Sequence, residues 1–149
     1  MAVASEEQSV VEKVPKGLYI GGEWRETAET IEVEDPSTGE VLAEVADATV
    51  DDALAALGAA ADAQAGWAAE HPRGRGRVLA DAYALIMERV DELALLMTLE
   101  MGKPLAESKA EVTYAADFFH WFAGEATRIE GGYKAAEKAD FRVITMRQP

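Results

Sequence analysis

Residues 96–112 read Leu-Met-Thr-Leu-Glu-Met-Gly-Lys-Pro-Leu-Ala-Glu-Ser-Lys-Ala-Glu-Val, and this stretch decides how the middle of the chain folds. Apolar residues recur at helical spacing up to Met101, and Gly102 follows where a glycine suits the left-handed end of a helix. Pro104 is tolerated in the first turn of a helix, because the amide that it lacks has no partner there. The stretch therefore predicts the end of one helix and the start of another, which should continue to about Ile129.

Further helices are predicted on the N-terminal side of this stretch. Thr49 and Asp52 have the spacing of a capping box, with Asp in place of the usual Glu, and apolar residues then recur every three or four positions. This helix should end before His71. A second helix is expected from about Arg77, and a third, capped by Asp91, leads into the stretch quoted above.

Short β units are predicted at both ends of the helical region, which makes the fold class α/β. Residues 18–25 and 31–45 carry β-prone runs separated by glycine-containing turns. The last predicted strand is 141–146, and no pairing partner for it is evident. Residues 1–16 are polar, mixed in charge and without a sustained apolar period, so we expect a loosely ordered arm before a folded segment at 17–149.

Composition and charge exclude several classes of function. The 149 residues include 28 Asp+Glu, 14 Lys+Arg and no cysteine, for a formal net charge of −14. Nucleic-acid binding is disfavoured, because it depends on an excess of basic groups. Without cysteine there is no disulfide, thiolate metal site or thiol nucleophile. The N-terminus lacks a signal-peptide pattern and no apolar run approaches the roughly 20 residues of a membrane span. We therefore expect a cytoplasmic protein with no membrane partner.

Two polar clusters are candidate binding sites, one for an anion and one for a metal ion. Residues 73–77, Arg-Gly-Arg-Gly-Arg, could hold a phosphate or carboxylate at a helix start. They lack the third glycine of a dinucleotide loop and the Lys-Ser/Thr of a P-loop, so a solvated loop and helix start is favoured. Asp117 and His120 share a helix face, and His71 is the only other histidine. No His-Glu-x-x-His spacing is present, so no metal site is predicted.

Five of the chain's eleven aromatic residues lie close together on the last helix. They are Tyr114, Phe118, Phe119, Trp121 and Phe122. Four of them fall on one broad helix face, which is typical of a core, and we predict burial with one ring at a pocket wall. On residue chemistry alone, the sequence indicates no reaction.

Four short motifs, in this order, resemble the N-terminal part of the NAD(P)-dependent aldehyde dehydrogenase superfamily. They are 18–24 (Leu-Tyr-Ile-Gly-Gly-Glu-Trp), 35–42 (Asp-Pro-Ser-Thr-Gly-Glu-Val-Leu), 99–109 (Leu-Glu-Met-Gly-Lys-Pro-Leu-Ala-Glu-Ser-Lys) and 114–125. The resemblance covers residues 15–149. Within the family, residues 96–112 and the Phe-His-Trp-Phe-Ala-Gly-Glu run are most similar to succinate-semialdehyde dehydrogenases.

The resemblance implies that an aldehyde, succinate semialdehyde in that subfamily, is oxidised to its acid with NAD or NADP. A cysteine forms a thiohemiacetal with the aldehyde, and a glutamate activates the water that releases the acid. In the family these groups, the oxyanion-stabilising asparagine and most of the cofactor site follow the stretch matched here. No catalytic, cofactor-binding or metal residue is therefore assigned in this chain, and the segment alone is expected to be inactive.

The resemblance also implies a fold and a weak site. Residues 17–149 should form β units and helices of the family fold, part of a Rossmann-like cofactor domain whose sheet is incomplete. Strand 141–146 resembles the start of the oligomerisation element, so a homo-oligomer is expected for the complete protein. Tyr114 and Phe118 are expected near the substrate entrance. A carboxylate-bearing aldehyde would need a cation, and this helix face offers no arginine.

Two further expectations concern exposed surface. A segment without its covering sheet should expose apolar helix residues and tend to associate. The residues expected on that surface are Leu85, Ile86, Leu95, Leu96 and Phe119. The alternative function is a stand-alone, non-catalytic interaction module that docks on full-length subunits through the unpaired strand 141–146.

Overall fold

The computed structural model describes residues 2–138 and 140–148. Three residues lie outside this description. They are Met1, the first residue of the predicted arm, and Ala139 and Pro149 of the predicted folded segment. The elements in chain order are α1 (Ala2–Lys13), β1 (Leu18–Ile20), β2 (Glu23–Arg25), β3 (Thr30–Glu34), β4 (Val41–Ala46), α2 (Val50–Ala69), α3 (Pro72–Glu88), α4 (Val90–Met101), α5 (Leu105–Glu125), β5 (Gly132–Ala135) and β6 (Arg142–Thr145). The fold class is α/β, as predicted, with the strands in separate two-stranded antiparallel hairpins.

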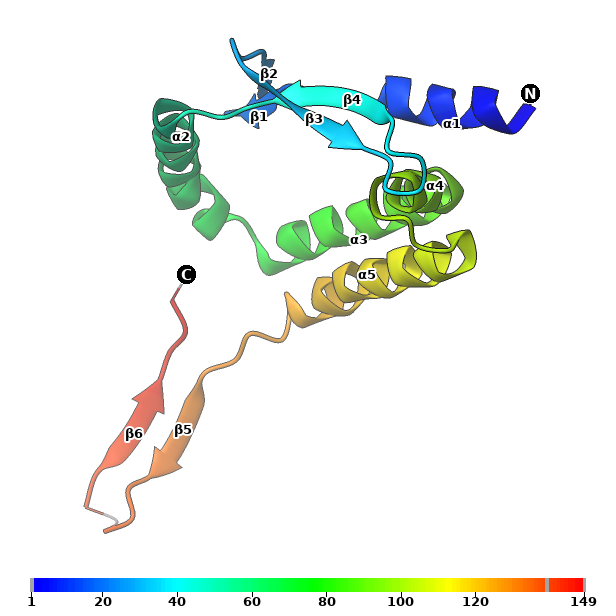
Figure 1. Ribbon diagram of the computed structural model, residues 1–149. Helices are drawn as coiled ribbons and strands as arrows, with labels where there is room; N and C mark the ends of the chain where they lie inside the picture. Colours follow the sequence, from blue (N-terminus) through cyan, green and yellow to red (C-terminus); the bar gives the residue numbers. More distant parts are fainter. Residues whose placement is uncertain (1, 139, 149) are drawn as a thin grey trace.

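Helices α3, α4 and α5 pack together and form the centre of the molecule (Figure 1). Their contacts are made largely by small side chains. Buried residues on α4 and α5 are Ala94, Leu99, Ser108, Val112 and Ala116. The Ser108 hydroxyl lies 3.0 Å from the Thr98 hydroxyl, which satisfies the buried polar group.

Gly76 allows α3 and α5 to approach each other closely. A Cβ atom at Gly76 would lie 2.7 Å from the carbonyl oxygen of Ala123 on α5, which is closer than a carbon and an oxygen can pack. Pro72 occupies the first turn of α3, where its missing amide costs nothing. Helix α3 therefore begins at Pro72, whereas the sequence predicted a start near Arg77.

The other predicted helix ends are partly confirmed. Thr49 and Asp52 form the capping box of α2, with the Thr49 amide donating to the Asp52 carboxylate at 2.9 Å. Gly102 ends α4 with a left-handed backbone, φ 70°. Asp91 is not the cap of α4, because Arg89 occupies that position. The Asp91 carboxylate instead pairs with Lys109 of α5 at 2.6 Å.

The N-terminal residues differ from the predicted loosely ordered arm. Residues 2–13 form α1, which packs on α4. Val10 is buried there, and Lys13 lies 3.5 Å from Glu92 of α4. The local sequence is too polar to predict this helix, because the apolar surface that supports it belongs to α4, more than 70 residues away.

The last predicted strand does have a partner. β6 pairs antiparallel with β5, with Gly132 opposite Thr145 and Ala135 opposite Arg142. The sequence pattern predicted a polar connector at the residues of β5. The expectation of an unpaired strand 141–146 was therefore wrong, because β5 is its partner. The β5–β6 hairpin extends away from the helices (Figure 1), and each described residue of it is exposed or half-buried.

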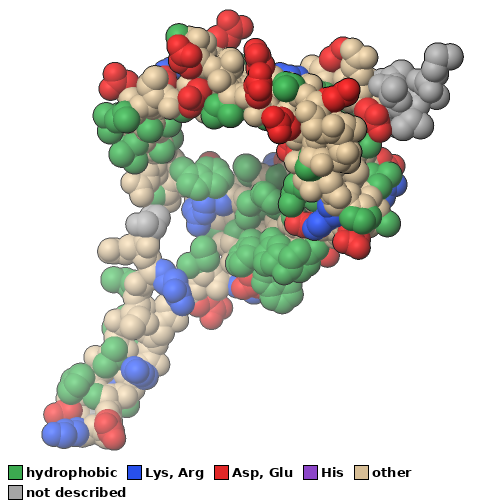
Figure 2. Space-filling model, viewed as in Figure 1, with side chains coloured by type: hydrophobic (Ala, Val, Ile, Leu, Met, Phe, Trp, Pro, Cys, Tyr) green, Lys and Arg blue, Asp and Glu red, His purple; other side chains and the backbone are tan. Residues whose placement is uncertain are grey.

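The apolar helix residues that the sequence predicted at the surface are only partly exposed. Leu85 of α3 and Phe119 of α5 are exposed, whereas Ile86, Leu95 and Leu96 are half-buried. Figure 2 shows hydrophobic side chains gathered over the helical region and acidic side chains over the N-terminal hairpins. Helix α2 buries none of its side chains, although it contacts the β1–β2 hairpin.

Candidate functional site

Helix α5 carries two different faces. Since a helix turns by about 100° per residue, Ser108, Val112 and Ala116 form one stripe, which is buried against α3 and α4. Four aromatic residues form the stripe on the other side, here called the aromatic face. These residues are Tyr114, Phe118, Trp121 and Phe122. All four are exposed, and Trp121 has 67% of its surface accessible.

The prediction that these aromatic residues form the core was therefore wrong. Small side chains occupy the buried stripe because Gly76 and Ala94 on the facing helices leave room only for close backbone contact. The sequence did contain a signal for this arrangement. Ser108, Val112 and Ala116 recur every four residues, which is the spacing of a helix face that packs closely on another helix.

Tyr114 and Phe118 form a contact pair within the aromatic face. Their ring centroids are 5.0 Å apart and their planes meet at 84°, an edge-to-face arrangement that aromatic rings favour. Tyr114 is 64% exposed and Phe118 is 48% exposed. The structure thus brings Tyr114 and Phe118, the two residues predicted near a substrate entrance, together in one exposed aromatic surface.

The basic run 73–77 is helical and forms no phosphate loop. Gly76 is buried against the backbone of α5, so its amide does not face a ligand. Arg75 donates a hydrogen bond to the carbonyl oxygen of Glu70, at the end of α2. The sequence predicted a solvated loop and a helix start here; the helix start is confirmed and the loop is wrong, because residues 73–77 lie in the first turns of α3. Among the described residues, this run forms no glycine-rich cradle for NAD or NADP.

The two histidines form no catalytic or metal centre among the described residues. The ring of His120 stacks on Tyr83 of α3, with centroids 4.7 Å apart and planes 22° from parallel. His71 precedes α3 and makes no side-chain capping bond. Among the residues that the structure describes, no group of three or more His, Asp or Glu is placed to hold a metal ion.

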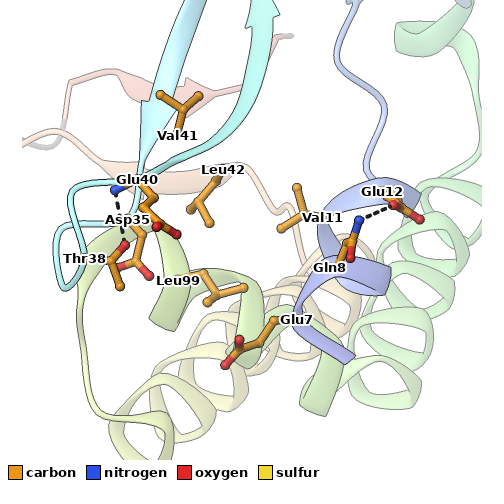
Figure 3. Close-up of a pocket in the computed structure, with 10 residues that line it drawn as sticks. All are labelled: Glu7, Gln8, Val11, Glu12, Asp35, Thr38, Glu40, Val41, Leu42 and Leu99. Carbon is orange, nitrogen blue, oxygen red and sulfur yellow. Dashed lines mark hydrogen bonds between the residues drawn. The ribbon is translucent and has the colours of Figure 1, made fainter. Parts of the chain in front are cut away.

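A pocket with an acidic rim lies between α1, the β3–β4 turn and α4 (Figure 3), with a volume of about 490 Å³. Glu7 and Glu12 of α1 and Asp35 and Glu40 of the turn are among its lining residues, and Leu99 lies between α1 and the turn. Gln8 donates a hydrogen bond to the Glu12 carboxylate at 3.1 Å. Hydrogen bonds from Ser37 lower the pKa of the Asp35 carboxyl, and the Ser37 amide donates to it at 2.7 Å. The Asp35 carboxylate therefore stabilises the β3–β4 turn.

Comparison with known proteins identifies the family of this chain. Residues 24–149 match the sequence profile described as "Aldehyde dehydrogenase family". The chain belongs to the aldehyde dehydrogenase family. It is 42% identical over 141 residues to succinate-semialdehyde dehydrogenase (NADP+) 1 of Schizosaccharomyces pombe, which covers 93% of this chain and 28% of that protein. It is 43% identical over 132 residues to the NADP+ enzyme GabD of Escherichia coli, and 42% identical over 133 residues to glutarate-semialdehyde dehydrogenase of Pseudomonas putida.

Solved structures of aldehyde dehydrogenases share the fold. An Escherichia coli NADP-dependent enzyme superposes with a TM-score of 0.81 at 42% identity, covering 87% of this chain and 27% of its own. Betaine aldehyde dehydrogenase of Staphylococcus aureus, solved in complex with NAD+, gives a TM-score of 0.84 at 30% identity over 92% of this chain and 28% of its own. The chain thus spans a little over a quarter of the length of the curated relatives that it matches.

Within that span the chain contains no cysteine. The exposed apolar surface of its described helices includes the aromatic face of α5, on which Tyr114 and Phe118 are in contact. None of the described helices is long and apolar enough to cross a membrane.

Proposed function

We propose that the chain is the N-terminal segment of an NAD(P)-dependent dehydrogenase that oxidises a semialdehyde bearing a carboxylate, succinate semialdehyde first among them. The observation that carries this proposal is the 42–43% identity to succinate- and glutarate-semialdehyde dehydrogenases over most of the chain. The substrates in those names share an aldehyde at one end of a short alkyl chain and a carboxylate at the other. Succinate semialdehyde is preferred because the succinate enzymes recur among the most similar relatives.

The residues described here serve the reaction by positioning and shielding. NAD or NADP, when bound to the complete enzyme, accepts the hydride, and the groups that bind it lie mostly outside this chain. The paired rings of Tyr114 and Phe118 form an apolar wall at the proposed substrate entrance. Such a wall favours the alkyl part of the substrate and keeps water from it.

Two protein forms test this proposal: the 149-residue chain and a full-length enzyme that contains it. We expect no reduced cofactor from the chain alone with any aldehyde, because it has no cysteine. We expect the full-length enzyme to oxidise succinate semialdehyde with a kcat/KM at least about tenfold above that for butanal, which lacks the carboxylate. Absorbance of NADH or NADPH measures both. Turnover by the chain alone, or equal rates for the two aldehydes, would overturn the proposal.

A second candidate is favoured by the exposed β5–β6 hairpin, whose Tyr133 and Ile144 side chains lie open to solvent. In this alternative the segment is a non-catalytic module that docks on full-length subunits through the hairpin. The homo-oligomer expected for the complete enzyme would use the same surface. The intact mass of the protein from its native source separates the candidates. A product of 16.0 kDa favours the docking module, and a much larger product favours a complete enzyme.

A further inference from the structure

A hollow of about 660 Å³ lies between the C-terminal end of α2, the helices α3 and α5, and the segment after β6. Its walls combine apolar and basic side chains. The apolar lining is Trp67, Leu79, Phe122, Ala126 and Ile129, and the charged lining is Arg75, Arg128, Arg147 and Glu125. We call this the arginine hollow. It gathers three guanidinium groups in a chain where acidic residues outnumber basic ones two to one.

The guanidinium groups retain donors for a ligand. Arg128 pairs with Glu125 at 2.5 Å, which neutralises the one carboxylate of the lining. Arg75 donates one hydrogen bond to the carbonyl oxygen of Glu70 and, among the described residues, joins no ion pair. Arg147 likewise joins none within the described part of the chain. Since each arginine carries five N–H donors, two guanidinium groups are left to bind an anion.

The hollow adjoins the aromatic face of α5. Phe122 belongs to both surfaces, because it follows Phe118 by one helical turn and also lines the arginine hollow. The aromatic face itself offers no cation, so a carboxylate that moves along it first meets positive charge beyond Phe122. The aromatic face could therefore contact the alkyl chain of a small molecule whose carboxylate binds the guanidinium groups of the arginine hollow.

We propose that the arginine hollow binds the carboxylate of a short aliphatic acid, with Arg75 and Arg147 holding the carboxylate and Trp67 and Phe122 contacting the alkyl chain. The choice of this ligand class rests on the proposed function, because a semialdehyde with a carboxylate and its dicarboxylate product both belong to it. The site needs neither cofactor nor nucleophile, so the chain as it stands should bind the ligand.

The experiment is a titration of the 149-residue chain with pentanoate, followed by the NMR signal of the Trp67 indole N–H, which Trp67→Phe assigns. Pentanamide has the same alkyl chain without the charge and is the ligand control. We expect a saturable shift with pentanoate and none at the same concentrations of pentanamide. Arg75→Gln and Arg147→Gln should each raise the Kd about tenfold, as expected for the loss of a charged hydrogen bond.

Matched controls separate this site from general attraction between opposite charges. Arg73→Gln and Arg77→Gln remove the same charge from the same helix but lie outside the lining of the hollow, so the Kd should change by less than about twofold. Because Arg75 also joins α3 to Glu70, circular dichroism checks the fold of its variant, and Arg147 makes no such contact within the described residues. Absence of saturation, an equal response to pentanamide, or equal weakening by Arg73→Gln would each overturn the site.

The outcome is independent of the test of the proposed function. If pentanoate fails to bind while the full-length enzyme oxidises succinate semialdehyde, the hollow is not a carboxylate site and the proposed function stands. If pentanoate binds while the full-length enzyme treats succinate semialdehyde and butanal alike, the site stands and the assigned substrate class is wrong.

Discussion

Helices α3–α5 and the β5–β6 hairpin are built on opposite plans within one chain. The helices are held by side chains buried between them, such as Ala94 and Val112, and by a glycine that permits backbone contact. The hairpin is held by its own backbone ladder, and none of its described side chains is buried. An isolated two-stranded hairpin is only marginally stable in water. Stability in this segment therefore resides in the helices, and the hairpin depends on whatever surface it contacts.

The largest expected effect contrasts one apolar truncation in each region. Leu99 of α4 is 8% exposed, so Leu99→Ala should lower the free energy of unfolding by about 2–5 kcal/mol through lost burial and a cavity. Ile144 of β6 is 68% exposed, and Ile144→Ala should change the free energy by no more than about 0.5 kcal/mol. Urea unfolding followed by circular dichroism measures both variants.

The variants Leu99→Ala and Ile144→Ala can also disprove this contrast between the helices and the hairpin. If Ile144→Ala costs as much as Leu99→Ala, the hairpin is packed in solution, and its partner must be another copy of the chain. The cost of Ile144→Ala would then grow with protein concentration, because association stabilises only the bound form.

A smaller effect on the free energy of unfolding tests the close contact between α3 and α5. Gly76→Ala places a methyl group 2.7 Å from the Ala123 carbonyl oxygen, and the resulting overpacking should destabilise the protein by about 1–3 kcal/mol. Gly58→Ala in α2 is the matched control, since no atom lies within 4 Å of the added methyl. There the better helix propensity of alanine should stabilise by about 0.5–1 kcal/mol. Stabilisation by both variants would show that α3 and α5 are not in close contact.

The smallest effect concerns pH and the start of α2. Hydrogen bonds from Thr49 lower the pKa of the Asp52 carboxyl below its ordinary value of 3.8. A carboxyl with a lowered pKa in the folded state stabilises the fold above pH 3.8, and this contribution is lost as the pH falls through the lowered pKa. Asp52→Asn should therefore be less stable than the wild type at neutral pH, with the difference narrowing in acid.

The control for this prediction is Asp51→Asn, because Asp51 lies in the same helical turn but outside the capping box. Thermal unfolding between neutral and acidic pH measures all three proteins. A gap between wild type and Asp52→Asn that stays constant with pH would mean that the cap does not depend on the charge of Asp52.

Local signals predicted most of the elements. The capping box at Thr49 and the left-handed Gly102 are decided by a few neighbouring residues, and both are confirmed. The elements that the sequence missed depend on distant contacts. Helix α1 is supported by α4, and β5 is defined by its pairing with β6, so neither has a sufficient pattern of its own.

The candidate site was harder to predict than the fold, because a helical pattern shows which residues share a face but not which face is buried. Tyr114 and Phe118 were correctly grouped, yet the hydrophobicity of their stripe suggested burial. The deciding residue is Gly76, on another helix, which selects the small stripe of α5 as the packed one. The sequence also could not predict that Arg147 and Arg75 line the same hollow, because the segment after β6 lies near α3 only in the folded chain.

Helix α2 has a consequence for how this chain tolerates changes in length. It buries no side chain, and its 20 residues give a rigid spacer of about 30 Å between the N-terminal hairpins and α3. One residue inserted in it would lengthen the spacer by only about 1.5 Å but would rotate everything beyond by about 100°. Point substitutions along α2, apart from Asp52 of the capping box and Trp67 of the arginine hollow, should therefore be widely accepted, whereas insertions and deletions should be rejected unless they come in near-whole helical turns.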